Sequence, residues 1–566
     1  MSNNLTTLDL LVFFVYLIGV SAYGFYIYKS KQKAEQSTKD YFLAEGSLTW
    51  WAIGASMIAS NISAEQFIGM SGSGFKVGVA VAAYEWVAAV VLIIVAVFFM
   101  PVYLKNKIFT MPQFLEQRYN STLSLIMSIF WLFLYVLVNL TSILYLGALA
   151  LSNLIGGDSF HTIIILLAIF SLLISIGGMK VVGYTDVVQV VVLVVGGLVT
   201  TYIALSLVST KFGLGGGAFS GFTALMEKAP DHFHMIFPKP TDATPQPEVD
   251  KYLALPGIAM YLAGQWIVNL NYWGCNQYIT QRALGADLHT ARTGILFAGI
   301  LKLMMPVIVM LPGIAAYVLY KNGDLQAEMS STGSFNSDNA YSAILTFLPN
   351  GLKGLSMAAL TAAIVASLAG KVNSISTIFT LDIYKRYLNK DASEKKQVWV
   401  GRLTILAAVV LSVAFTWQDL LGIGGEGGFQ FIQKYTGFIS PGILAVFLLG
   451  MFWKRTTATA GIVGILAGFA LSVFFNEYAP SVLGRETLLY TAFPNGKGEF
   501  EIPFLICMGL SFAITMVLMV GTSLAGPAIN AKAIDLNPGM FRVSRQTMTL
   551  IVITMLMLTA LYVKFW

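Results

Sequence analysis

Six ionisable side chains lie inside apolar segments long enough to cross a bilayer, and their chemistry needs an explanation. They are Glu65, Glu85, Asp186, Lys302, Lys371 and Lys434. Each charge costs on the order of 3 kcal/mol at the centre of a membrane, so such residues usually mark functional sites. Glu85 and Lys302 have apolar neighbours on both sides and are not loop residues. Facing one cavity, they would offset each other's charge and still offer a ligand donors and acceptors. The alternative is a structural ion pair that joins two helices.

Amide side chains add a second kind of polar group to four of these segments: Gln66, Asn139, Asn269 and Gln433. A single such amide is most often an interhelical hydrogen bond worth about 0.6 kcal/mol. Together with Glu85 and Lys302, the four would present donors and acceptors with almost no net charge. That chemistry suits a neutral polyhydroxylated molecule better than an ion or an amino acid. Apolar walls would come from side chains nearby in sequence, although such residues are usually packing: Met70, Tyr84, Tyr272 and Phe429.

A third group of polar atoms suits a hard cation. Where a membrane helix unwinds, its carbonyl oxygens lose their amide partners and can coordinate Na⁺. The polar stretch SNISAEQF (60–67) would free carbonyls near Ala59 and Ile62. The segment LTAAIVASLAGKVNSIST has a face of small residues and the hydroxyl of Ser367, which would complete an oxygen site. Without an unwound partner helix, this face would be read as ordinary small-residue packing.

The elements that must position these groups are membrane helices. The 566 residues are 57% hydrophobic and 11% charged, whereas soluble domains carry about 25% charged residues. We predict fourteen spans, because runs of about 20 apolar residues recur and no strand-like alternation does. They lie near 8–28, 50–73, 78–104, 121–155, 159–178, 184–209, 254–276, 291–321, 343–384, 400–419, 430–450, 456–476, 502–526 and 545–565. The fold class is therefore an all-α polytopic membrane protein.

Two predicted spans are interrupted by polar and glycine residues. One is 50–73, with SNISAEQF at its centre; the other is 254–276, with Gly264, Asn269 and Asn271 along it. Five spans separate their start positions, which suggests two inverted five-helix repeats, each opening with a discontinuous helix, as in secondary transporters. The predicted organisation is an extra helix and cytoplasmic loop (1–49), repeat one (50–209), an outside loop (210–253), repeat two (254–450) and three C-terminal helices (451–566).

The charge pattern orients the chain. Most Lys and Arg residues fall in alternate connections, so the net charge of +6 reflects topology and gives no reason to expect a nucleic acid partner. The positive-inside rule then predicts both termini outside the cytoplasm, in a multi-pass protein of the cell inner membrane. Loop 210–253 is expected to be an ordered surface lid, and its His232 and His234 to be solvated rather than metal-bound. The glycine-rich stretch 69–78 matches no phosphate-binding motif, and we expect no enzyme.

Longer motifs carry a resemblance. The stretches that carry the resemblance are ASNISAEQFIGMSGSG, AYEW, VNLTSILYLGALAL, YTDVVQV, NQYITQR, LPGIAAYV, IFTLDIYK and YTGFISPGILAVFLLGMFWKR. The sequence resembles the solute:sodium symporter family, especially its sodium/galactose and sodium/glucose cotransporters. The resemblance covers nearly the whole chain. It implies fourteen helices around a leucine-transporter-type 5+5 inverted-repeat core that moves sugar and Na⁺ together by alternating access.

Carried over residue by residue, the resemblance implies roles for the polar groups described above. The sugar contacts would be Gln66, Glu85, Asn139, Asn269, Lys302 and Gln433, with Asn61 close by. The inner gate would be Tyr272, and the outer gate Met70, Tyr84 and Phe429. Sodium would be held by backbone oxygens of Ala59, Ile62 and Ala363 with the hydroxyl of Ser367. Asp186 would lie on the sodium exit route.

Three positions depart from the family pattern. Ala88 stands where a serine hydroxyl is expected in the sugar site, which removes a hydrogen bond worth about 1 kcal/mol. Ala366 replaces the first of two adjacent serines at the sodium site, which should weaken sodium binding or leave a water there. Lys371 replaces an apolar residue nearby. Two outcomes are open for its ammonium: it reaches the membrane interface, or it partly substitutes for bound sodium.

The leading hypothesis is a sodium-coupled importer of a neutral hexose such as galactose or glucose. One alternative is symport of another solute, such as myo-inositol or sialic acid. A different class of function, a sugar sensor or a facilitator uncoupled from sodium, is suggested by Ala366 and Lys371.

Overall fold

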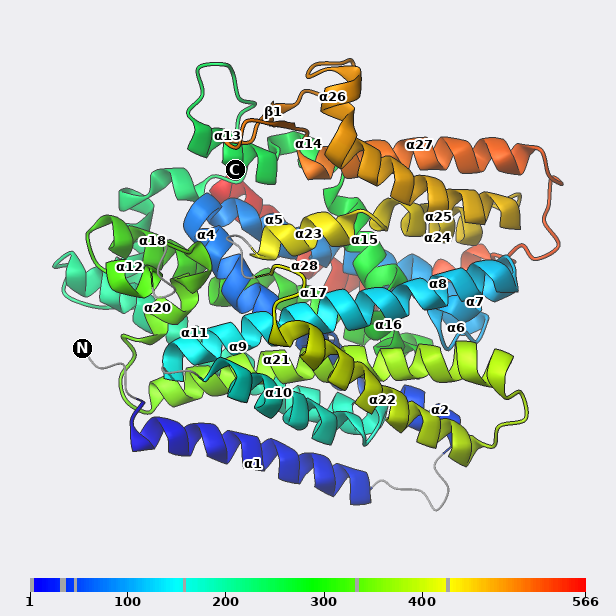
Figure 1. The fold of residues 1–566 in the computed structure, drawn as a ribbon, viewed down its shortest axis with the longest axis horizontal. Coiled ribbons are helices and arrows are strands. Elements are labelled where there is room, and N and C mark those ends of the chain that lie inside the picture. The colour runs from blue at the N-terminus through cyan, green and yellow to red at the C-terminus, as the bar shows by residue number, and fades with distance from the viewer. Residues whose placement is uncertain (1–4, 31–36, 45–47, 156–158, 331–334, 424–427) are drawn as a thin grey trace. The chain divides into compact units, whose positions relative to one another are not determined.

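The computed structural model describes residues 5–30, 37–44, 48–155, 159–330, 335–423 and 428–566 (Figure 1). Residues 31–36 and 45–47 of the predicted cytoplasmic loop 29–49 lie outside the described residues. Helices dominate the described chain, and its single two-stranded sheet pairs β1 (Phe493–Pro494) antiparallel with β2 (Phe500–Glu501). The predicted all-α class is confirmed.

Helix length and composition support fewer membrane spans than the fourteen predicted. Among the described residues, eleven helices are long and apolar enough to cross a membrane, or up to twelve with a pair bent by 76°. Every one of the fourteen predicted segments contains helix, but the count of fourteen spans is not confirmed. Segment 159–178 holds only a 16-residue helix, and segments 50–73 and 78–104 share one long helical stretch, Glu65–Lys105.

The chain divides into two compact units whose segments alternate along the sequence. Unit 1 comprises residues 1–78, 127–233 and 277–429. Its elements are α1 (Thr7–Ser30), α2 (Thr38–Leu43), α3 (Trp50–Asn61), η2 (Glu65–Met70), α4 (Ser71–Val77), η5 (Leu134–Leu140), α9 (Thr141–Ile155), α10 (Phe160–Ser175), α11 (Met179–Lys211), α12 (Ala218–Lys228), η6 (Pro230–Phe233), α16 (Gln277–Leu284), α17 (Leu288–Val309), α18 (Leu311–Lys321), α19 (Gln326–Met329), η7 (Ser337–Asn339), α20 (Ala340–Leu345), α21 (Leu352–Thr377), η8 (Ile378–Leu388) and α22 (Glu394–Trp417).

Unit 2 comprises residues 79–126, 234–276 and 430–566. Its elements are α5 (Ala83–Ile94), η4 (Val95–Phe99), α6 (Met100–Lys105), α7 (Met111–Arg118), α13 (Gln246–Ala254), α14 (Gly257–Leu262), α15 (Gln265–Cys275), α24 (Ser440–Phe452), α25 (Ala458–Val473), η9 (Phe474–Tyr478), α26 (Ala479–Leu483), β1, β2, α27 (Phe504–Leu524), η10 (Pro538–Phe541) and α28 (Arg545–Phe565). Three further elements run along the chain from one unit into the other: η3 (Gly78–Ala82), α8 (Ser121–Phe133) and α23 (Gly428–Gly437).

Helix α21 forms the core of unit 1. It packs against α1, α10, α22, α11 and α3, and most of its residues are buried. Its small residues Ala362, Ala363, Ala366 and Ala369 are all buried, which lets neighbouring helix backbones come close. The predicted small-residue packing is therefore present, and it brings α21 against the end of α3.

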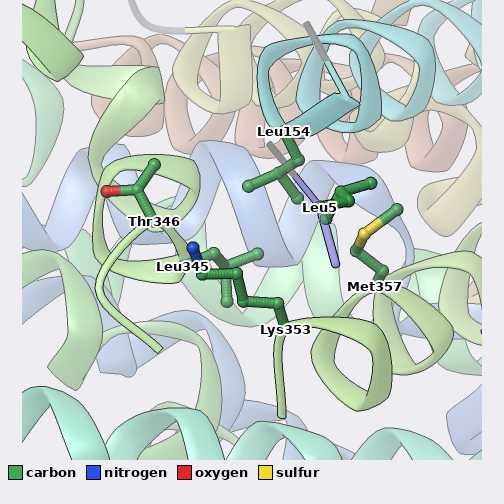
Figure 2. A pocket seen from close by; sticks show the side chains of 6 residues that line it. All are labelled: Leu5, Leu154, Leu345, Thr346, Lys353 and Met357. Atoms are coloured by element: carbon green, nitrogen blue, oxygen red, sulfur yellow. The ribbon is translucent and has the colours of Figure 1, made fainter. Parts of the chain in front are cut away.

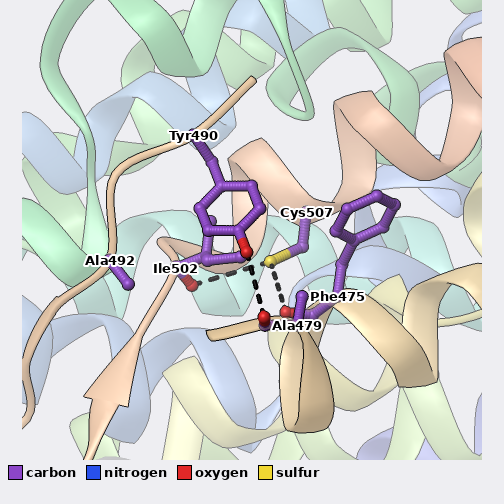
Figure 3. Packing of buried hydrophobic residues seen from close by; sticks show 6 residues of the cluster. All are labelled: Phe475, Ala479, Tyr490, Ala492, Ile502 and Cys507. Carbon is purple, nitrogen blue, oxygen red and sulfur yellow. Dashed lines mark hydrogen bonds between the residues drawn. The ribbon is translucent and has the colours of Figure 1, made fainter. Parts of the chain in front are cut away.

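The core of unit 2 contains helices α24, α25 and α27, which pack against one another. At one end, a cluster of buried residues joins η9, α26 and the strand region to α27 (Figure 3). Within it the Tyr490 hydroxyl donates to the Ala479 carbonyl at 3.0 Å, and the Cys507 thiol contacts the Phe475 carbonyl at 3.5 Å. Cys275 and Cys507 are both buried free thiols.

Both predicted helix interruptions are confirmed. Helix α3 ends at Asn61, and Ile62 takes an extended conformation with ψ 114° before helix resumes at η2. In unit 2, α14 ends at Leu262 and α15 begins at Gln265, with the bend between them. A Cβ on Gly264 would lie 2.5 Å from the Leu505 carbonyl oxygen, so glycine here allows the bend to pack closely on α27.

Candidate functional site

The interruption after α3 is held open by a capping box. The Ser63 hydroxyl accepts a hydrogen bond from the Glu65 amide at 3.2 Å, as a helix N-cap does. Gln66 reaches back, and its Oε1 accepts from both the amide and the hydroxyl of Ser63 at 3.0 Å. This is the reciprocal S-x-x-Q arrangement that starts helices in soluble proteins. The second helical segment therefore begins with its own cap, inside a stretch of buried residues.

The same hydrogen bonds release two carbonyl oxygens. In a continuous helix the Ser63 amide would bond to the Ala59 carbonyl, and the Gln66 amide to the Ile62 carbonyl. Here the Ser63 amide donates to Gln66 Oε1, and the Gln66 amide donates to the Ser63 carbonyl at 3.1 Å. Ala59 and Ile62 are fully buried. Their carbonyl oxygens thus lose their usual helical donors in a site away from bulk water.

Helix α21 presents a hydroxyl to this end of α3. The Ser367 hydroxyl donates to the Ser60 carbonyl at 3.1 Å. Ala363 lies one turn earlier on the same face of α21, since residues four apart in a helix are aligned. Ala366 is buried and has no side-chain oxygen to offer. The structure therefore places the Ser367 hydroxyl against the end of α3 that carries Ala59, with Ile62 directly after it and Ala363 on the same helix face as Ser367.

Lys371 continues that face of α21 by one further turn. It is 3% exposed, and its ammonium donates to the Ser367 hydroxyl at 2.8 Å. The same Nζ lies 4.7 Å from the centre of the Tyr278 ring, a cation–π contact. Of the two outcomes left open for this ammonium, the structure excludes extension to an interface and places it against a predicted cation ligand.

A buried ion pair adjoins this region. Asp186 Oδ2 accepts from the Ser56 hydroxyl at 2.5 Å and lies 3.7 Å from Arg282 Nη1. Arg282 Nη2 donates to the Ser60 hydroxyl at 2.5 Å, so the guanidinium lies between Asp186 and the end of α3. A Cβ on Gly370 would collide with the same guanidinium. Arg282 is not among the residues predicted from the sequence, because it lies in the connection between the predicted spans 254–276 and 291–321. Its place in the motif NQYITQR was the signal that could have identified it.

Four predicted sugar contacts and two gate residues belong to unit 1. The Lys302 ammonium, on α17, donates to the Asn61 side-chain oxygen at the end of α3, and both residues are buried. Gln66 and Asn139 are also buried, on η2 and η5. For the gate, Met70 is fully buried at the end of η2.

Phe429 completes the unit 1 set of gate residues. It is 3% exposed. A Cβ added to Gly69 would lie 2.6 Å from the Phe429 Cβ. The glycine preceding Met70 therefore lets η2 approach Phe429 closely.

The remaining candidates belong to unit 2. Tyr84, Glu85 and Ala88 are buried on α5. Helix α15, which packs against α5, carries the buried Asn269 and the half-buried Tyr272. Asn269 Nδ2 donates to the Gln265 carbonyl within its own helix at 2.9 Å. Gln433 is half-buried on α23.

Lys434, next to Gln433, lies 3.7 Å from Glu477 in a partly exposed pair. This pair accounts for the charge of Lys434 in an apolar segment.

The expectation of a solvated histidine pair is wrong for one member. His232 is 3% exposed, stacks on Tyr317 with ring centres 3.9 Å apart and contacts the Phe75 carbonyl at 2.9 Å. Aromatic stacking and a backbone partner thus bury a side chain that sequence alone placed in water. His234 is exposed. No group of three or more His, Cys, Asp or Glu side chains able to hold a metal occurs within the described part of the chain.

A small pocket in unit 1 is unsuited to a sugar. It is lined by Leu5, Leu154, Leu345, Thr346, Lys353 and Met357 (Figure 2). Its volume of about 10 Å³ is near the minimum for a single water. The lining is mainly aliphatic, so this pocket is not the substrate site.

A family model described as the sodium:solute symporter family matches residues 41–468. The chain belongs to the sodium:solute symporter family. The symporter is 43% identical to the sodium/glucose cotransporter of Vibrio parahaemolyticus over 575 residues, covering 100% of this chain and 99% of that relative. It is 32% identical to sodium/myo-inositol cotransporter 2 of Mus musculus, covering 82% of this chain and 69% of the relative.

The fold of the symporter also matches a solved structure. A Na⁺-coupled sialic acid symporter in a substrate-bound, outward-open state gives a TM-score of 0.74 at 21% identity, with 93% of this chain and 99% of that chain covered. At this identity the likeness shows the fold alone.

Family membership settles the broad activity. The protein is a transporter and not an enzyme, it is a multi-pass membrane protein, and sodium is its coupling ion. The oxygen atoms gathered at the end of α3 fit that ion, because unwound carbonyls and a hydroxyl are the donors that secondary transporters use for Na⁺.

Proposed function

We propose that the symporter imports a neutral hexose, glucose or galactose, together with sodium. The observation that carries this proposal is the 43% identity to the Vibrio sodium/glucose cotransporter across essentially the full length of both chains. The candidate polar groups agree with it, since they combine one acid, one base and several amides with no excess charge.

The sugar contacts in this proposal are Gln66, Asn61, Asn139, Lys302, Glu85, Asn269 and Gln433. In Gln66 the capping box uses Oε1, so Nε2 is the part of the amide assigned to the sugar. Ala88 contributes no hydroxyl. Tyr272 serves as the inner gate, and Met70, Tyr84 and Phe429 as the outer gate.

Sodium is proposed to bind the carbonyls of Ala59, Ile62 and Ala363 and the hydroxyl of Ser367, with Asp186 on the exit route. By joining α3 to α21, sodium would favour the outward-open state, because it would bind that conformation more tightly than the other. One positive charge entering down about 100 mV supplies roughly 2.3 kcal/mol, before the concentration gradient is added.

A second neutral polyol deserves a test. The myo-inositol cotransporter is also a relative, and myo-inositol would use the same uncharged donors and acceptors. Sialic acid would need a net cationic pocket, which the candidates do not supply. Competition for labelled glucose uptake in proteoliposomes separates these solutes: glucose and galactose should inhibit more strongly than myo-inositol, and sialic acid should not inhibit. Stronger inhibition by myo-inositol would overturn the hexose assignment.

The architecture in this proposal has fourteen spans, with two inverted repeats of the leucine-transporter type at 50–209 and 254–450. The segments 1–49, 210–253 and 451–566 are additions to that core. Both termini are placed outside the cytoplasm of an inner-membrane protein. Membrane-impermeant labelling of a single cysteine added at either end tests the orientation, and labelling only after lysis would contradict it.

A further inference from the structure

Lys371 brings a fixed positive charge to the oxygen atoms assigned to sodium. Its ammonium donates to the Ser367 hydroxyl at 2.8 Å and sits 4.7 Å from the Tyr278 ring centre. A hydroxyl oxygen and an aromatic face both stabilise a monovalent cation. The ammonium is therefore held by the same kinds of group that would stabilise a bound sodium ion.

Binding sodium beside the Lys371 ammonium costs electrostatic free energy. Unit charges 4 Å apart repel by about 1 kcal/mol in water and by about 4 kcal/mol near a protein surface. Ser367 Oγ donates its proton to the Ser60 carbonyl and has two acceptor lone pairs, so a sodium ion on one of them would lie directly beside the ammonium on the other.

Glu65 is placed to receive a displaced ammonium. It lies at the start of η2, just past the helix break, and its carboxylate has the charge opposite to that of the Lys371 ammonium. Its buried Oε1 has no hydrogen-bond partner among the described residues. Asp186, the other buried carboxylate of this region, is already paired with Arg282. Glu65 is therefore the carboxylate that can accept the ammonium.

We propose that the Lys371 ammonium is a tethered competitor of sodium at Ser367, and that Glu65 takes the ammonium when sodium binds. This inference rests on the proposed sodium ligands. Without sodium, Lys371 occupies the Ser367 hydroxyl, next to Ala366, which offers no side-chain oxygen. Sodium must displace it, so this symporter needs more sodium for half-saturation than the same site with an apolar residue at 371.

Replacing the ammonium by an uncharged chain of similar length tests the competition. Lys371→Met should lower the sodium concentration that gives half-maximal thermal stabilisation of the detergent-purified protein by about tenfold or more, since a repulsion of over 1 kcal/mol is relieved. The measurement is a binding readout made without sugar, with choline replacing sodium. Lys371→Gln is the second variant if Lys371→Met does not fold.

Lys353→Met is the matched control on the same helix. It makes the same charge change eighteen residues away, about 27 Å along α21, and should leave the sodium dependence unchanged. An unchanged or higher sodium requirement in Lys371→Met would overturn the competition. No stabilisation of the wild type by sodium at any concentration would instead contradict the proposed sodium site itself.

The Glu65→Gln variant tests whether the carboxylate acts on the Lys371 ammonium or on sodium. In the wild-type background it should raise the half-saturating sodium concentration, because the displaced ammonium loses its partner. In the Lys371→Met background the increase should be smaller by about fivefold, as expected when two side chains are coupled by about 1 kcal/mol. Equal increases in both backgrounds would show that Glu65 acts on sodium directly and would overturn its assigned role.

Discussion

Gln66 combines two roles that the sequence did not separate. It was predicted as a sugar contact, and its Oε1 also completes the capping box with Ser63. A cap in this position redirects the amides that would otherwise occupy the Ala59 and Ile62 carbonyls. One side chain therefore links the proposed sugar contact to the proposed sodium ligands.

Gln66→Leu should weaken sodium binding as well as sugar binding. Without Oε1, the Ser63 amide is free to return to the Ala59 carbonyl, and a lost cap of about 1 kcal/mol corresponds to about a fivefold higher half-saturating sodium concentration. Sodium-dependent thermal stabilisation without sugar measures this. Gln66→Glu keeps the capping box and should not raise the requirement. Wild-type sodium dependence in Gln66→Leu would separate the two roles.

Lys302 gives the most direct residue-scale test of the sugar site. Lys302→Met removes the ammonium that donates to Asn61 while keeping a chain of similar length. Losing one partner of a buried charged hydrogen bond costs about 2 kcal/mol or more, so uptake at low sugar concentration should fall about 30-fold.

The control for this variant is Lys211→Met, whose ammonium pairs with Asp324 at the surface. It should transport normally in the same proteoliposome assay. Normal uptake by Lys302→Met would remove Lys302 from the site.

The two discontinuous helices were predictable because polar and glycine residues interrupt otherwise apolar runs. What held them in place was not predicted. The S-x-x-Q signature at Ser63 was visible but was not recognised as a cap inside a membrane segment. Arg282 was hidden by its position in a connection, and the burial of His232 depends on Tyr317, 85 residues away in sequence. Such contacts arise from tertiary packing and leave no local pattern.

Gly264 tests the second break at the scale of the helix. Gly264→Ala would press a methyl group against the Leu505 carbonyl, and overpacking of this kind costs about 1–3 kcal/mol. Its melting temperature in detergent should fall. Gly521→Ala, on α27 with nothing within 4 Å of the added Cβ, should be neutral or stabilising because alanine favours helix. Equal melting temperatures for the two variants would contradict the close approach.

At the scale of the whole molecule, composition and hydropathy predicted a polytopic helical membrane protein, and family membership confirms the transporter class. The span count was harder, because span length alone does not decide whether a 16-residue helix such as α10 crosses the membrane. The fold does not decide the substrate, since proteins similar to this chain carry different solutes in their names.

The central claim is that a sodium gradient drives hexose import. Labelled glucose uptake into proteoliposomes, with an inward sodium gradient or with equal potassium, tests it most directly. The account predicts transient accumulation above the external concentration only with the sodium gradient, abolished by a sodium ionophore. Equilibration to the same level with sodium and with potassium would contradict it.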